Sequence, residues 1–83
     1  MSKKLYQKLY DQNQDIIDRL KHIKILIPIA AKRNNFVVLN RIESERDAII
    51  SDLRSQLDAA YHATPVKSVK DAGVAKFWEL VNK

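Results

Sequence analysis

The sequence contains no cysteine, one glycine and two prolines among its 83 residues. Without cysteine the chain has no disulfide, no thiolate nucleophile and no cysteine-ligated zinc site, which fits the reducing cytoplasm. So few glycines and prolines leave too few turns for an all-β sandwich. A chain of this length is also too short to divide into two domains. These shortages predict a single all-α domain over residues 1–83.

Long apolar runs and recognisable catalytic motifs are missing as well. The most apolar window, residues 23–31, is interrupted by Lys24 and falls far short of the roughly 20 residues that cross a bilayer. No apolar signal-peptide core follows the basic start, so we expect a cytoplasmic protein without a membrane span. Neither His22 nor His62 has a metal ligand four residues further on, and no nucleophile elbow or glycine-rich nucleotide loop is present. We expect no enzyme activity, no metal and no cofactor.

Apolar residues recur at helical spacing along three stretches, residues 1–34, 36–63 and 65–83. In the first stretch the apolar side lies within about 80° on a helical wheel and comprises Leu5, Leu9, Ile16, Leu20, Ile23, Ile27 and Ala30. Pro28 lacks the amide hydrogen that a helix interior uses, which predicts a kink near Pro28. The β-branched residues within 23–27 leave a short strand as the alternative there.

A chain reversal is predicted at Asn34-Asn35, because asparagine tolerates the left-handed conformation and also caps helices. Reversal at this point pairs positions whose numbers sum to about 69, and it places Asn13 beside Gln56. The two polar interruptions of the apolar seams would then hydrogen-bond to each other. We therefore expect a long kinked antiparallel helical hairpin with a short third, C-terminal helix packed against it.

The first stretch carries more apolar surface than one neighbouring helix can cover. Ile25 and Ile29 lie about 160° or more from its core side, so residues 23–31 are apolar almost all round. Either the C-terminal element or a second copy of the chain must cover them. A hairpin arm of about 28 residues would be about 42 Å long, which is elongated for a monomer of this size. This favours a homodimer and a dimeric bundle.

Three aromatic residues are candidate contact residues, because tryptophan and tyrosine are enriched at interface hot spots. Trp78 follows Phe77 directly, so the two rings cannot face the same core, and Trp78 either anchors a partner or half-covers the end of the hairpin. Tyr6 and Tyr10 form either a contact patch or the amphipathic rim of the bundle. With Ile25 and Ile29, these three are the predicted partner-binding residues.

The net charge of +5 is unevenly distributed, with +5 in residues 1–34, −2 in residues 35–63 and +2 in residues 64–83. A basic stripe is formed by residues that share one side of the first helix or lie near the same end of the hairpin, namely Lys21, Lys24, Lys32, Arg33 and Arg41. Such a stripe either meets phosphates or is simply a solvated helix face.

In size, charge and helix order the chain is similar to the small antiparallel helical bundles that give bacteria immunity to bacteriocins. The apolar surplus and the missing catalytic motifs favour docking over catalysis. We expect a non-enzymatic protein–protein interaction module of the inhibitor, immunity or adaptor kind. The alternative is a small basic accessory or regulatory factor that associates with nucleic acid through the stripe.

Overall fold

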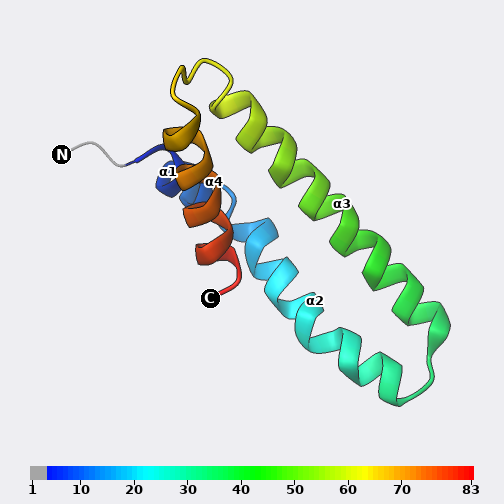
Figure 1. Ribbon diagram of the computed structural model, residues 1–83. Coiled ribbons are helices and arrows are strands. Elements are labelled where there is room, and N and C mark those ends of the chain that lie inside the picture. Colours follow the sequence, from blue (N-terminus) through cyan, green and yellow to red (C-terminus); the bar gives the residue numbers. More distant parts are fainter. Residues whose placement is uncertain (1–3) are drawn as a thin grey trace.

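The computed structural model describes residues 4–83, and this part of the chain forms four helices and no strand (Figure 1). The helices are α1 (Leu5–Gln12), α2 (Gln14–Lys32), α3 (Phe36–Ala60) and α4 (Lys67–Val81). The predicted all-α class is confirmed. The alternative of a strand over residues 23–27 is wrong, because these residues lie inside α2. The first three residues of the predicted helix 1–34 lie outside the described part.

The stretch predicted as one helix is two helices, and the interruption is at Asn13 rather than at Pro28. The Asn13 side-chain amide donates to the Leu9 carbonyl over 2.8 Å, and the backbone at Asn13 leaves helical geometry with φ −111° and ψ 21°. An asparagine side chain that bonds to the backbone in this way competes with the helix. Downstream, α2 continues through Pro28, and the predicted kink is not confirmed. Pro28 and Lys24 are both exposed, so water can satisfy the carbonyl that Pro28 leaves without a donor.

The register of the long helices is set by polar residues as well as by apolar ones. Figure 1 shows α2 and α3 running side by side in opposite directions. Asn13 Nδ2 donates to Gln56 Oε1 over 2.7 Å, and Gln56 Nε2 donates to Asn13 Oδ1 over 3.0 Å. The predicted pairing of Asn13 with Gln56 is therefore confirmed. Because the two amides satisfy each other, a polar pair can sit at the edge of the apolar core.

The turn between α2 and α3 uses both properties of the asparagine pair. Asn34 adopts the left-handed conformation with φ 54°. Asn35 is the N-cap of α3, and its side-chain oxygen accepts from the Val38 N–H over 3.3 Å. Two adjacent residues thus reverse the chain and start the next helix.

The third predicted element, residues 65–83, is helical from Lys67 onward, and Thr64-Pro65 belongs to the linker before it. Within the described part, α4 lies against α1. It contributes Phe77 and Val81 to the core, each only 1% exposed. The remaining core residues come from the other helices and the turn after α3: Leu9, Ile17, Leu20, Ile23, Ala30, Ile42, Ile49, Leu53, Leu57 and Tyr61.

The molecule is elongated because α4 stays at one end of the α2–α3 pair. The extents are 47 × 22 × 18 Å and the radius of gyration is 15.1 Å, against about 12 Å for a compact domain of this length. At the other end α2 and α3 run on alone to their turn (Figure 1). We call this end, residues 25–41, the hairpin tip.

Candidate functional site

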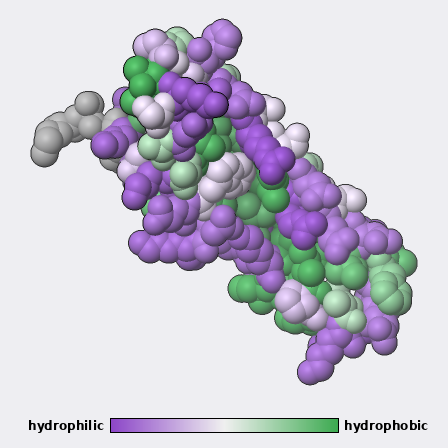
Figure 2. Space-filling model, in the orientation of Figure 1, coloured by the Kyte–Doolittle hydropathy of each residue, from purple (hydrophilic) through white to green (hydrophobic). Residues whose placement is uncertain are grey.

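The hairpin tip carries the largest group of exposed apolar side chains in the described residues. Ile25 is 62% exposed and Ile29 44%, on α2, while Phe36 is 62% and Val37 73% exposed at the start of α3. Val38 joins them at 39%. Figure 2 shows hydrophobic residues gathered at this end of the molecule. Exposed apolar side chains gathered at one end of a small protein are typical of a contact site.

The exposure of Ile25 and Ile29 follows from the way α2 packs. Its buried residues Leu20, Ile23 and Ala30 face the core, so Ile25 and Ile29 point the other way. The end of α4 reaches α2 at Lys24, whose amine hydrogen-bonds to the Asn82 side chain. The C-terminal helix therefore does not cover the two isoleucines, and that alternative of the prediction is wrong. Helix α4 uses its apolar face against α1 instead.

Phe36, Val37 and Val38 were not singled out from the sequence. The exposure of Val37 could have been predicted, because on a helical wheel this residue lies about 160° from the core residue Leu39. Since Leu39 is the first residue of α3 that packs against the core, the turn before it projects beyond the bundle. These three residues extend the exposed apolar side chains of the hairpin tip from α2 to the start of α3.

The predicted aromatic contact residues lie elsewhere. Trp78 is half-buried against the core, and its ring meets that of Phe77 edge-on, with centroids 5.3 Å apart and an interplanar angle of 81°. Tyr6 and Tyr10 are likewise half-buried against the core on α1, at the opposite end of the molecule from the hairpin tip. The structure thus does not unite the five predicted partner-binding residues in one surface. It favours the interpretation in which Trp78 half-covers the end of the hairpin and Tyr6 and Tyr10 form the amphipathic rim of the bundle.

The basic stripe is divided by contacts within the chain. Lys21 Nζ donates to the Tyr10 hydroxyl over 3.2 Å and lies 5.6 Å from the centre of its ring, and the Lys24 amine is held by Asn82. Hydrogen bonds from Gln14 and then Lys21 lower the pKa of Tyr10. These two lysines are therefore engaged within the fold.

The other three members of the stripe, Lys32, Arg33 and Arg41, are exposed, and their side chains make no hydrogen bond or ion pair within residues 4–83. All three belong to the hairpin tip. No aspartate or glutamate occurs between Asp18 and Glu43. The tip therefore combines apolar side chains with uncompensated positive charge.

One ion pair between helices was not predicted. Arg19 of α2 donates to both carboxylate oxygens of Glu45 of α3, over 2.7 and 2.9 Å. The hydrogen bond from Arg19 lowers the pKa of Glu45, and the same bond raises the pKa of Arg19. This bidentate pair lies at the surface, so it sets the alignment of the helices more than their stability.

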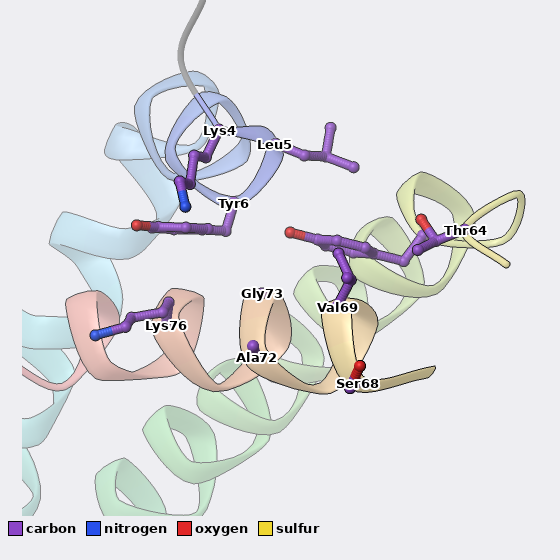
Figure 3. A pocket seen from close by; sticks show the side chains of 10 residues that line it. Lys4, Leu5, Tyr6, Thr64, Ser68, Val69, Ala72, Gly73 and Lys76 are labelled. Carbon is purple, nitrogen blue, oxygen red and sulfur yellow. The ribbon is translucent and has the colours of Figure 1, made fainter. Parts of the chain in front are cut away.

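A hollow of about 580 Å³ lies at the opposite end from the tip, between α1, the turn after α3, and α4. Figure 3 shows Tyr6 reaching from α1 towards α4, where Gly73 and Lys76 form part of the opposite wall. Tyr61 also lines this hollow, and burial raises the pKa of its phenol against the opposing effect of a hydrogen bond with the Tyr6 backbone. The hollow is open and mainly apolar, and Lys4 and Lys76 are the charged residues lining it.

No group of three or more histidine, aspartate or glutamate side chains that could hold a metal ion is found among residues 4–83. None of the helices in this range has both the length and the hydropathy to cross a membrane. Comparison with protein-family models, curated proteins and solved structures finds no match to this chain. The function must therefore be argued from the molecule's own surface.

Proposed function

We propose that this chain is a non-enzymatic protein–protein interaction module of the cytoplasm, which docks onto a partner protein through the hairpin tip. The observation that carries this proposal is the exposure of Phe36 and Val37 at the start of α3, beside the unpaired cations Arg33 and Arg41. Nothing in residues 4–83 covers these side chains. A small helical protein that keeps aromatic and β-branched residues in water gains free energy when another surface covers them.

The chemistry of the tip indicates the kind of partner. Burying a phenylalanine or valine side chain contributes about 1.5–3 kcal/mol, and arginine is enriched among interface hot spots. Positive charge around an apolar centre selects a partner with an apolar contact surrounded by carboxylates, and it accelerates their encounter. The action of such a module is steric: it occupies a partner's surface as an inhibitor or immunity-type protein, or holds two proteins together as an adaptor.

The test is affinity capture with the tagged chain from cells that make it, followed by calorimetric titration of the purified captured protein. Val37→Glu is expected to weaken binding at least tenfold, because the new carboxylate would be repelled by the carboxylates of the partner. The matched control is Val66→Glu, at a valine 50% exposed before α4. Equal binding by wild type and Val37→Glu would show that the tip is not the docking surface. The function would be refuted if no captured protein binds the purified chain in the calorimetric titration.

Nucleic-acid binding is the second candidate, and the free cations Lys32, Arg33 and Arg41 at one end favour it. Neutralising phosphates releases counterions, so binding would weaken steeply with salt concentration. A fluorescence titration with DNA and RNA duplexes at several salt concentrations tests this. Absent binding, or binding that is independent of salt, would dismiss this candidate.

A further inference from the structure

The outward face of α2 has a regular arrangement of charge. Asp18, Ile25 and Lys32 lie seven residues apart, so they form a line along the helix with only about 20° between successive side chains. All three are exposed, and Ile29 lies one turn from Ile25 beside this line. The face therefore runs from an acid through an apolar centre to a base.

Two charges of opposite sign are placed symmetrically about Ile25 on this face, whereas Ile29 has Lys21 at the equivalent position on the other side. Asp18 and Lys32 each lie about 10.5 Å along the axis from Ile25, in opposite directions. Neither side chain has a hydrogen bond or ion pair with another described residue. A two-fold contact requires a surface that is complementary to itself, and an acid and a base equally spaced from an apolar centre meet that requirement.

We propose that a second copy of this chain covers this face. In the dimer, α2 packs antiparallel against α2 of the other copy, with the two-fold axis at Ile25. Ile25 then meets its own equivalent, and Asp18 faces Lys32 of the partner subunit. This contact takes Ile25, Ile29 and Lys32 of the hairpin tip, whereas the docking proposed above rests on Phe36 and Val37 at the start of α3. Its test uses this chain alone and is therefore independent of partner docking.

The charge pattern distinguishes this occupant from others. A parallel copy would set acid against acid and base against base, which opposes association. An anionic lipid surface or an acidic partner would attract Lys32 but repel Asp18. Ile25 and Ile29 are the only apolar residues named in this contact, so it lies at the small end of specific interfaces and weak association is expected.

Sedimentation equilibrium of the purified full chain over micromolar concentrations tests the contact. Wild type is expected to show a monomer–dimer equilibrium, and Ile25→Lys to remain monomeric at every concentration. Because Ile25 is exposed, this substitution leaves the monomer folded, which circular dichroism verifies. Val66→Lys, at an exposed valine remote from this face, is expected to dimerise like wild type. A monomeric wild type, or a dimeric Ile25→Lys, would overturn the proposal.

A charge swap tests the antiparallel register. Asp18→Lys and Lys32→Asp should each weaken the dimer about tenfold, because each creates two like-charge pairs where the wild type has two opposite pairs. The double variant Asp18→Lys/Lys32→Asp should dimerise like wild type, since every pair is again of opposite sign. If the double variant is no tighter than the single ones, the antiparallel register is wrong. These measurements involve no other protein, so they stand or fall separately from partner docking.

Discussion

Substituting Gly73 with alanine tests how closely α4 packs beneath Tyr61. Gly73 is buried in the middle of α4, and a Cβ atom placed there would lie 2.5 Å from Tyr61 Cζ and still closer to the hydroxyl oxygen. Ordinary contact at a Cβ begins at 3.4 Å, and the hydroxyl oxygen would lie only 2.1 Å away, so Tyr61 and α4 would have to separate by about 1.3 Å. Tyr61 is only 5% exposed and belongs to the core, so moving its ring into the hollow that it lines would give up buried contacts.

Two opposing effects decide the outcome. In an exposed helix interior alanine is more stable than glycine by about 0.8–1.0 kcal/mol. Forcing an extra carbon into a packed site costs about 1–3 kcal/mol, and more where neighbours cannot move. Because the overlap at Gly73 involves several ring atoms, we expect the packing cost to win, with a net loss of about 1–2 kcal/mol. For a domain of this size each kcal/mol lowers Tm by about 4–8 °C.

Thermal and urea unfolding followed by circular dichroism measure the effect of Gly73→Ala. The same substitution in a Tyr61→Leu background removes the ring, so there it should stabilise or be neutral. Ala75→Gly, at an exposed position of the same helix, reports the helix propensity alone. A Gly73→Ala protein as stable as wild type, or more stable, would refute the reasoning, because α4 could then not be packed tightly beneath Tyr61.

Two further predictions concern the polar pair and the tyrosines. Asn13→Ala removes the donor to Gln56 Oε1, while Gln56 Nε2 keeps its bond to Asp52, so the free energy of unfolding in urea should fall by about 1 kcal/mol, and an unchanged value would show that the pair is dispensable. In a spectrophotometric titration Tyr10 should ionise below its usual pKa of 10.0 and Tyr61 above it, and Tyr10→Phe and Tyr61→Phe should remove the early and late steps respectively. Folding raises the pKa of Tyr61, so its contribution to stability is present below pH 10.0 and is lost as the pH rises through the folded value. The free energy of unfolding of Tyr61→Phe should therefore fall less steeply with pH above 10.0 than that of the wild type. Assignment of the early step to Tyr61 would contradict the burial of its phenol.

The local features of this protein were predictable from its sequence. The helical class follows from apolar spacing, the turn from the asparagine pair Asn34-Asn35, and the contact of Asn13 with Gln56 from the register that this turn imposes. These features depend on neighbours within a few residues or on two helices joined by a short turn. For such features the geometry of the helix determines which side chains meet.

The remaining features depend on where α4 lies. A helical wheel gives the direction of each side chain, but it does not say which element occupies that direction. Only the tertiary structure showed that α4 packs on α1, which buries Phe77, engages Lys24 and leaves Ile25 uncovered. Likewise the helix break fell at Asn13 and not at Pro28, because Asn13 bonds both to Leu9 and to Gln56 while Pro28 sits in water. The sequence pattern determined the helical class, the turn and the facing seams, whereas contacts between distant segments determined where the first helix breaks and which surface remains exposed.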